Sequence, residues 1–314
     1  MDIAFVIDPI ESLRAYKDST VAMMREAAAR GHGVHAIHHD TLEWRGAAGV
    51  GAPSLALELL ADDAHWWRER GTADGPLTRF DALLMRKDPP FDMEYVYATH
   101  LLELAEAAGV RVLNRPRSLR DFNEKLAIAR FARFTAPTLV TSNEASLRAF
   151  LAEHGDMVVK PLDGMGGASV FRLHTRDPNV GVILETITHF GRRTVMAQRY
   201  LPEIAQGDKR ILVIDGVAAP FALARIPKAG ESRGNLAAGG RGVAQPLTAR
   251  DREIAEGVGP ALRAAGLTIV GLDVIGEHLT EVNVTSPTCM REILDQTGFS
   301  VAAMVLDALE RPAA

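Results

Sequence analysis

The first 120 residues alternate short apolar runs with stretches of helical character. Residues 3–7 form a continuous apolar run that ends at Asp8-Pro9, and the alanine-rich stretch 18–30 then closes at Gly31. The same order recurs, with strands expected at 34–37, 81–85 and 110–113 and a helix at 93–108. Strands that alternate with helices favour a parallel sheet, so this part of the chain is expected to form one α/β unit.

The segment 42–78 interrupts this alternation. Its glycines and prolines, among them Gly46, Gly49, Pro53 and Pro76, are scattered through the segment rather than gathered at one turn. We therefore expect an irregular insertion that holds one helix, and the residues of this insertion indicate no chemistry.

The second half of the chain has a different pattern. A helix is expected at 121–134, and short strands then follow one another through tight turns such as Asp215-Gly216, which favours antiparallel pairing. The expected strands are 138–140, 157–160, 170–173, 194–198, 210–214, 217–225, 268–275 and 279–284, with helices at 144–153, 180–190 and 250–265. The stretch 226–242 has five glycines and no apolar period, which is typical of a linker or of a lid that moves over a site.

Charge and cysteine content exclude several classes of partner. The formal net charge of −5 leaves no basic excess that would draw the chain onto nucleic acid or an anionic membrane. The single cysteine, Cys289, cannot form an internal disulfide, which favours a buried thiol in a reducing compartment. No secretory signal opens the sequence and no apolar run reaches the length of a membrane span, so we expect a cytoplasmic protein.

A lysine and three glycines in the stretch KPLDGMGG suggest a site for an anion. Lys160 ends a predicted strand, and Gly164, Gly166 and Gly167 follow in a turn whose backbone N–H groups could approach a phosphate closely. The stretch lacks the lysine-serine ending of a Walker loop, and Ser169 stands where a dinucleotide fingerprint requires a glycine. A plain turn between two strands explains the same glycines, so both interpretations stay open.

Two neighbouring strands near the end of the chain carry candidate metal ligands. Glu281 and Asn283 are two residues apart, so their side chains leave the same face of a strand. If residues 276–278 form the connection, the pairing register places Asp273 opposite Glu281 and adds a third oxygen ligand. Carboxylate and amide oxygens in this number suit Mg²⁺, which keeps its other positions for water and phosphate. The alternative is a solvated acidic face on an edge hairpin.

Several long motifs occur in order along nearly the whole chain. They are DSTVAMM (18–24), MRKDPPFD (85–92), NEKL (123–126), KPLDGMGGASVFR (160–172), MAQRYLP (196–202), GDKRILVIDG (207–216), LARIPKAGESRGNLAAGGRG (223–242) and GLDVIGEHLTEVNVTSPTCMREI (271–293). With these motifs the sequence resembles the bacterial glutathione synthetases, which are members of the ATP-grasp ligases. The resemblance thins out at 40–80, at 174–192 and after 293.

The resemblance implies a fold class and a division into domains. A parallel α/β domain would cover residues 1–122, and an ATP-grasp fold of two α+β subdomains with mainly antiparallel sheets would follow. The central or lid subdomain would cover 123–202, and the C-terminal subdomain would cover 203–314 with 226–242 as a flexible catalytic loop. Bacterial relatives assemble from identical subunits, so a homo-oligomer is expected.

The resemblance also implies an ATP site between two antiparallel layers, with two Mg²⁺ ions that Mn²⁺ could replace. The phosphates would be held by Lys125 and Lys160, beneath the turn of Gly164, Gly166 and Gly167 as a flap. The adenine would contact Gln198, Tyr200 and Leu201, and the ribose would contact Asp208. From the residues alone, an exposed helix lysine is the favoured interpretation of Lys125, and MAQRYLP is equally an ordinary strand end.

Four arginines are the implied catalytic residues. Arg210 and Arg225 are expected on strands that face the cleft, and Arg233 and Arg241 on the glycine-rich loop. Fixed cations stabilise the negative charge that spreads over a transferring phosphoryl group. Loop arginines would arrive only when the loop closes and excludes water. The alternative for Arg233 and Arg241 is a pair of solvated loop charges.

The implied reaction is ATP-dependent ligation. ATP would phosphorylate the cysteinyl carboxylate of γ-glutamylcysteine, and the amine of glycine would then displace phosphate to give glutathione. The implied substrate residues are Arg86, Asp18 and Ser19 for the dipeptide and Ser286 and Thr288 for the acceptor. Two rivals remain: an ATP-grasp ligase for another acid and amine, such as a D-alanine–D-alanine type enzyme, and a non-catalytic ATP-binding module.

Overall fold

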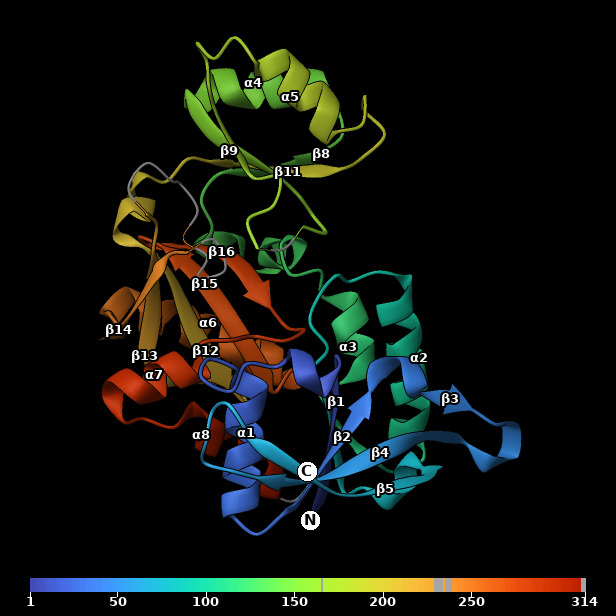
Figure 1. Ribbon diagram of the computed structural model, residues 1–314. Coiled ribbons are helices and arrows are strands. Elements are labelled where there is room, and N and C mark those ends of the chain that lie inside the picture. Colours follow the sequence, from blue (N-terminus) through green and yellow to red (C-terminus); the bar gives the residue numbers. More distant parts are fainter. Residues whose placement is uncertain (165, 229–233, 235–238, 312–314) are drawn as a thin grey trace.

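The computed structural model describes residues 1–164, 166–228, 234 and 239–311, and these residues form three sheets (Figure 1). Sheet A has seven strands, sheet B has four and sheet C has five. Sheets B and C are antiparallel throughout their described pairs, and sheet A contains the parallel strands. The predicted fold class is therefore confirmed, whereas the division at residues 122 and 202 stays a prediction.

Sheet A begins as a parallel sheet, as the alternation of strands and helices predicts. β1 (Asp2–Ile7) pairs in parallel with β2 (Gly33–His38) and β6 (Ala82–Met85), and β6 pairs in parallel with β7 (Arg111–Leu113). The crossovers contain α1 (Ser19–Ala29) and α2 (Met93–Ala107). Each helix starts at an aspartate, Asp18 or Asp92, whose side chain accepts N–H groups of the first turn.

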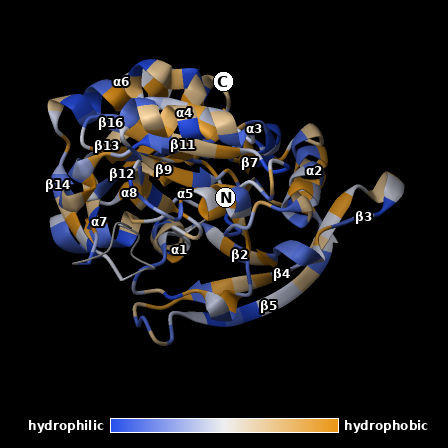
Figure 2. Cartoon of the chain, turned by 90° about the horizontal axis from the view of Figure 1, so that it is seen from above, coloured by the Kyte–Doolittle hydropathy of each residue, from blue (hydrophilic) through white to orange (hydrophobic). Residues whose placement is uncertain are grey.

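The prediction of an irregular insertion with one helix at 42–78 is wrong. The segment forms β3 (Glu43–Trp44), β4 (Val50–Leu59) and β5 (Trp67–Pro76), which extend sheet A as an antiparallel hairpin. This hairpin projects along the outer side of the molecule (Figure 2). The described helices near it are the short 3₁₀ turns η2 (His39–Thr41), η3 (Gly46–Ala48) and η4 (Leu77–Arg79). The glycines misled the prediction because Gly71 serves the bulge in β5 rather than a loop.

The continuous helix expected at 121–134 is also wrong. α3 (Pro116–Asp121) ends before it, and the 3₁₀ helix η5 (Leu126–Phe134) begins only after Lys125 and is kinked at Phe131. Asn123 explains the break, because its Oδ1 accepts the N–H groups of Lys125 and Leu126 at 3.2 and 2.9 Å and so starts a new turn. Lys125 therefore stands at a helix start and not within a helix.

Sheet B has the strand order β10-β9-β11-β8. Its strands are β8 (Thr138–Thr141), β9 (Asp156–Pro161), β10 (Phe171–His174) and β11 (Val195–Arg199). α4 (Glu144–His154) and α5 (Val180–Ile187) cover one face of this sheet, and their leucines and isoleucines form a separate apolar core with it. The other face is left for contacts with sheet C (Figure 1).

Sheet C has the order β14-β13-β12-β15-β16, with β16 at one edge. Its strands are β12 (Asp208–Ile214), β13 (Val217–Ile226), β14 (Arg241–Pro246), β15 (Ile269–Ile275) and β16 (His278–Asn283), and η6 (Pro202–Gln206) leads into it. α6 (Ala249–Ala264) covers one face with its hydrophobic residues and shows hydrophilic ones beside them (Figure 2). The predicted pair of Asp273 and Glu281 is confirmed, but the expected connection 276–278 is wrong. Ile275 already pairs with His278, and a register shift between Asp273 and Val274 sets Asp273 opposite Glu281.

The last two helices return to the first domain. α7 (Met290–Thr297) packs beside β13 and β14, and α8 (Val301–Glu310) packs against α1. Arg30 at the end of α1 reaches α8, where its Nη1 lies 2.8 Å from Asp307 Oδ1 and 2.9 Å from Glu310 Oε2. One apolar core thus joins β1, α1, α8 and β12, so sheet A and sheet C share their packing. Within the described part of the chain, every helix is too short or too polar to cross a membrane.

Candidate active site

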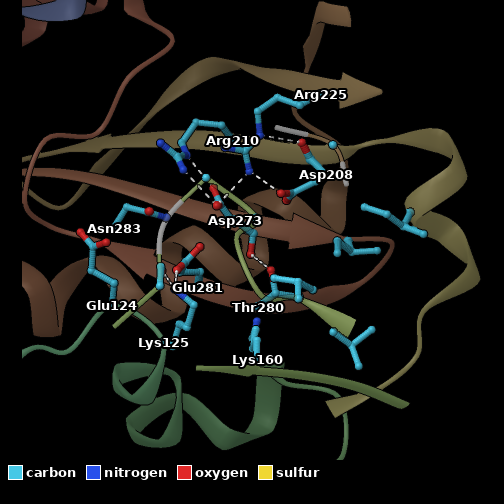
Figure 3. A pocket seen from close by; sticks show the side chains of 18 of the residues that line it. Glu124, Lys125, Lys160, Asp208, Arg210, Arg225, Asp273, Thr280, Glu281 and Asn283 are labelled. Atoms are coloured by element: carbon cyan, nitrogen blue, oxygen red, sulfur yellow. Dashed lines mark hydrogen bonds and ion pairs between the residues drawn. The ribbon is translucent and has the colours of Figure 1, made fainter. Parts of the chain in front are cut away.

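A cavity of about 380 Å³ lies between sheets B and C. Its wall takes residues from β9 and β11 of sheet B and from β12, β13, β15 and β16 of sheet C. The first domain contributes Asp88 and Pro89. Further wall residues include Glu124, Lys125, Gly164, Gly166, Gly167, Thr285, Ser286, Thr288 and Cys289. Figure 3 shows lysines, arginines and carboxylates converging on this space. The volume and the few clustered polar groups are typical of a small-molecule site.

Two arginines and two aspartates form an ion-pair network in the cavity (Figure 3). Arg210 on β12 faces Asp273 on β15, and its Nη2 lies 3.0 Å from Asp273 Oδ2. Arg225 on β13 lies 2.8 Å from the same oxygen and also pairs with Asp208. The side chains of Arg210, Arg225 and Asp273 are only 7%, 6% and 4% exposed, so the low local dielectric strengthens these pairs.

The network moves the two carboxyl pKa values in opposite directions. Burial alone would raise the pKa of Asp273, but the guanidiniums of Arg210 and Arg225 hold it well below its ordinary value. Burial raises the pKa of Asp208 to about 6, a shift that Arg225 opposes and the charge of Asp273 reinforces. Asp273 is therefore the carboxylate that stays ionised, whereas Asp208 exchanges its proton in a mildly acidic range.

Two lysines enter the cavity from the side of sheet B (Figure 3). Lys125 Nζ donates to Glu281 Oε1 at 2.8 Å and also to Gly164 O. Lys160 on β9 has no ion-pair or hydrogen-bond partner among the described residues, and burial lowers the pKa of its ammonium, a shift that Glu281 opposes. An ammonium group without a counterion in a buried site favours an anionic ligand.

The three predicted metal ligands lie around one cavity. Asp273, Glu281 and Asn283 all line it, from the paired strands β15 and β16. Asn283 Nδ2 donates to Gly271 O at 3.2 Å, which leaves its Oδ1 without a hydrogen bond among the described residues. No three His, Cys, Asp or Glu side chains of the described chain form a metal-binding group, so the amide oxygen of Asn283 is needed to complete the set. These donors suit a hard divalent cation.

The glycine turn forms another part of the wall. Gly164, Gly166 and Gly167 line the cavity, and Gly166 and Gly167 have φ values of 63° and 79°. A Cβ at Gly164 would lie 2.8 Å from Pro161 Cγ, which is closer than side chains pack. Glycine is therefore required here both for backbone conformation and for space.

The residues predicted at the adenine and ribose end also line the cavity, namely Gln198, Tyr200, Leu201 and Asp208. The side chain of Gln198 donates to Thr138 Oγ1 at 3.1 Å, so its amide is held against β8. The guanidinium of Arg172 lies 3.6 Å from the centre of the Tyr200 ring. This end of the cavity thus offers aromatic and apolar contacts, unlike the charged end.

The structure describes one of the two predicted loop arginines. Arg233 lies outside the described residues. Arg241 is the first residue of β14, where it pairs with Ile226, and it is not part of the described cavity wall. The prediction that Arg241 belongs to the loop is therefore wrong, because β13 and β14 extend the sheet further toward the loop than their sequence pattern indicates.

The predicted substrate residues divide into two groups. Ser286 and Thr288 line the cavity. Arg86, Asp18 and Ser19 are not among the described wall residues: Arg86 is buried and bonded to Pro287 O at 3.0 Å and Thr20 Oγ1 at 3.1 Å, Asp18 caps α1, and Ser19 Oγ accepts from Met290 N. Arg86 and Ser19 thus contact residues next to the wall, and Asp18 fixes the start of α1.

The wall residues that were missed from the sequence include Asp88, Glu124, Thr285 and Cys289. Asp88 and Glu124 occur within the motifs MRKDPPFD and NEKL, but neither residue has a local pattern that indicates its partners. Burial raises the pKa of Glu124, and the charge of Glu281 adds to this shift. Cys289 is buried as predicted, and burial raises the pKa of its thiol.

The chain is similar to known proteins over nearly its full length. The family models of the prokaryotic glutathione synthetase N-terminal domain and ATP-grasp domain match residues 1–120 and 124–298. A glutathione synthetase of Nitrosomonas europaea is 58% identical over 99% of this chain and 98% of its own length. One from Neisseria meningitidis serogroup A is 56% identical over 98% of each chain.

Solved structures share the fold at low sequence identity. The D-cycloserine synthetase DcsG has a TM-score of 0.67 at 17% identity and covers 98% of this chain and 100% of its own. The ATP-grasp ligase PsnB, complexed with a minimal precursor, has a TM-score of 0.65 at 19% identity over 98% of both chains. These two neighbours show the ATP-grasp fold. Together with the family models and the full-length relatives, they lead to one conclusion: the chain belongs to the prokaryotic glutathione synthetase family.

Proposed function

We propose that this chain is an ATP-dependent ligase that joins γ-glutamylcysteine and glycine to form glutathione, ADP and phosphate. The observation that carries this proposal is the full-length identity of 56–58% to glutathione synthetases. The cavity supports it, because it places two lysines, two arginines and an oxygen-ligand set around one space between the two antiparallel sheets. The chemistry is positioning and charge stabilisation, and it requires no covalent intermediate on the protein.

We propose that ATP occupies this cavity with its phosphates at the charged end. Lys160 would pair with a phosphate because it has no counterion among the described residues, and Lys125 would be shared between a phosphate and Glu281. The turn at Gly164, Gly166 and Gly167 would lie over the phosphates. The base would contact Gln198, Tyr200 and Leu201, and Asp208 would accept from the ribose.

We propose that the divalent cation is Mg²⁺, in two copies that Mn²⁺ can replace. Asp273, Glu281 and Asn283 would hold it, since they supply the oxygen atoms of the charged end. When bound, the metal would neutralise part of the phosphate charge. In the structure both oxygens of Asp273 pair with Arg210 and Arg225, so Asp273 would have to release one of these arginines to hold the cation.

Arg210 and Arg225 are the proposed catalytic cations for acyl phosphate formation. Each guanidinium lines the cavity while it is held by an aspartate, so each is oriented before a substrate enters. Arg233 and Arg241 stay proposals as loop residues that act on closure. For Arg241 this requires that the start of β14 moves toward the cavity.

The proposed acceptor contacts are Ser286 and Thr288, which line the cavity next to the metal candidates. Arg86 would act on the dipeptide through the wall, because its guanidinium holds Pro287 between these two residues. Asp18 and Ser19 would keep α1 and α7 in place behind the same wall.

We also propose a cytoplasmic homo-oligomer whose partners are small molecules. Met93, Tyr97 and Leu104 lie along one side of α2 and are 56%, 52% and 49% exposed, a stripe that a second copy could cover. The net charge of −5 gives no attraction to nucleic acid or anionic membranes. Light scattering of the purified chain checks the number of subunits.

The deciding experiment is ADP formation by the purified protein with single omissions. We expect ADP and glutathione only when γ-glutamylcysteine, glycine, ATP and Mg²⁺ are all present, with mass spectrometry identifying the product. Activity with D-alanine in place of both substrates would instead support another ATP-grasp ligase. ATP binding without ADP formation under any of these conditions would support a non-catalytic module.

A further inference from the structure

Glu124 takes the place of a missing neighbour strand at the free edge of β16. β16 is the last strand of sheet C, so its outward N–H groups have no strand to pair with. The N–H of Val282 donates to Glu124 O at 2.8 Å, and the N–H of Val284 donates to Glu124 Oε1 at 2.8 Å. One residue thus supplies two successive acceptors along the edge, one from its backbone and one from its side chain.

The same carboxylate oxygen also fixes the turn that follows the strand. Glu124 Oε1 accepts the N–H of Thr285 at 3.0 Å and its hydroxyl at 2.9 Å. From the opposite side, Asn114 Nδ2 donates to Val284 O at 2.8 Å. The backbone at 284 is therefore held at both its N–H and its C=O group. The hydrogen bonds to the Glu124 carboxylate are charge-assisted and therefore stronger than bonds between neutral groups.

The hydrogen bonds to Glu124 fix the positions of two side chains that line the cavity. Along β16, Val282 is fully buried, while Glu281 and Asn283 point the other way and line the cavity. If the backbone at 282 and 284 is fixed, then the two residues beside Val282 have fixed Cα positions and directions. Glu124 itself lines the cavity next to both of them (Figure 3).

The neighbours of Glu124 connect the same point to the rest of the site. Lys125 pairs with Glu281, and Asn123 Nδ2 donates to Leu162 O at 3.1 Å, just before the glycine turn. Residues 123–125 therefore contact the segment that follows β9, strand β16 of sheet C and the glycine turn. The motif NEKL, which the sequence suggests only as a source of one lysine, makes all of these contacts.

We propose that Glu124 is a positioning residue of the ligase, which holds the end of β16 so that Glu281 and Asn283 present their oxygens to the cavity. The proposal rests on the proposed function, since it assigns a role within that site. Replacing a residue that merely stabilises the fold would lower the unfolding temperature and leave the metal affinity of the folded protein unaltered. Replacing a positioning residue changes both the protection of the strand end from amide hydrogen exchange and the cation affinity.

The test compares Glu124→Ala with Glu124→Gln in the full chain. The glutamine keeps a side-chain oxygen that accepts N–H groups, and alanine does not. We expect amide hydrogen exchange at Val284 and Thr285 to accelerate by about tenfold or more in the alanine variant, because the exchange rate follows local opening. We expect the glutamine variant to restore most of the protection.

A second measurement determines the cation affinity in the absence of turnover. Mn²⁺ binding in the presence of a non-hydrolysable ATP analogue, followed by electron paramagnetic resonance, should weaken by about ten- to a hundredfold in Glu124→Ala, the range for residues that orient metal ligands. The rate constant kcat should fall by a similar factor, with a smaller change in the KM for ATP. Glu124→Gln should lie closer to the unaltered protein in both measurements.

Thr248→Ala is the matched control. Thr248 also holds a backbone N–H group through its side chain, that of Asp251 at the start of α6, but it does not line the cavity. It should lower the unfolding temperature and leave exchange at 284–285, Mn²⁺ affinity and kcat as they are. Unchanged exchange or unchanged Mn²⁺ affinity in a folded Glu124→Ala protein would overturn the proposal. Absence of glutathione formation by the unaltered chain would instead refute the proposed function.

Discussion

Lys125 Nζ lies 2.8 Å from Glu281 Oε1 although 156 residues separate the two in sequence. The side chains are 9% and 21% exposed, so the pair is mostly shielded from water. The lysine approaches from the start of η5 and the glutamate from β16, and each is within a motif of the predicted nucleotide site. A cation and a metal-ligand candidate are thus already paired in the free protein.

Replacing Lys125 by methionine should weaken ATP binding and also destabilise the fold. The loss leaves Glu281 without its partner, and breaking a buried pair on one side costs about 3–5 kcal/mol at full burial and less here, since Glu281 is partly exposed. Calorimetric titration with a non-hydrolysable ATP analogue and a thermal melt measure the two effects. Lys209→Met is the control, because Lys209 forms a buried pair with Asp251 away from the cavity. ATP affinity that falls equally in both variants would contradict the prediction.

Replacing Lys160 by methionine should weaken ATP binding without the loss of stability. Lys160 has no counterion among the described residues and burial lowers its pKa, so its charge opposes folding in the absence of a ligand. The unfolding temperature of the ligand-free variant should therefore stay the same or rise, while the shift that ATP produces becomes smaller. A clear drop in the unfolding temperature without ATP would show that a structural partner was lost.

Asp208 should make the stability of the folded state depend on pH in a specific direction. Its pKa is raised from 3.8 to about 6, so the folded protein keeps a proton that the unfolded chain has lost between these values. The contribution of Asp208 is therefore fully present at pH values below its unfolded pKa and is lost as the pH rises through about 6.

The comparison with Asp208→Asn isolates this effect. The stability of the unaltered protein relative to the variant should decrease with rising pH across this window, by about 1.4 kcal/mol for each unit of pKa difference. Urea unfolding at several pH values provides the measurement. A stability difference that stays constant or grows as the pH rises would disprove the assignment. Asp273 should show the opposite trend, since its pKa is lowered.

Replacing Arg86 by alanine should raise the KM for γ-glutamylcysteine much more than the KM for ATP. Arg86 holds Pro287 O and Thr20 Oγ1, so its loss releases the turn that carries Ser286 and Thr288. The change should also lower the free energy of unfolding by about 1–3 kcal/mol, because Pro287 O loses its buried donor. Steady-state kinetics with each substrate varied in turn separates the two KM values. An unaltered KM for the dipeptide would remove Arg86 from the substrate site.

The part of the site that follows from local sequence was predictable. The two-residue period of β16 puts Glu281 and Asn283 on the same face. Their place opposite β15 also depends on a register shift after Asp273, because an unbroken register from the turn at Gly276 would set Asp273 opposite Thr280. Lys160 and the glycine turn are likewise adjacent in sequence. The order of strands and helices in the first domain indicates its parallel sheet, because each crossover is built from consecutive residues.

The missed features depend on contacts between distant segments. Nothing in the residues around Glu124 indicates that its carboxylate accepts the N–H of Val284, 160 residues later. The guanidinium of Arg86 could bind a substrate carboxylate, but in the structure it donates to the backbone oxygen of Pro287. The hairpin β4–β5 was missed because one of its strands is polar and exposed, so it lacks the alternation that marks a strand with one buried face.

The packing of α1 against α8 has a consequence for biosynthesis. α1 ends at Ala29, whereas the helix that covers it ends at Glu310, so the ribosome must release nearly the whole chain before the two can meet. Until then the side of α1 that packs against α8 stays uncovered in the nascent protein, and exposed apolar surfaces of this kind are the ones that chaperones bind. The domain that is translated first therefore completes its packing late. A chain that is truncated before α8 would expose this apolar surface to solvent.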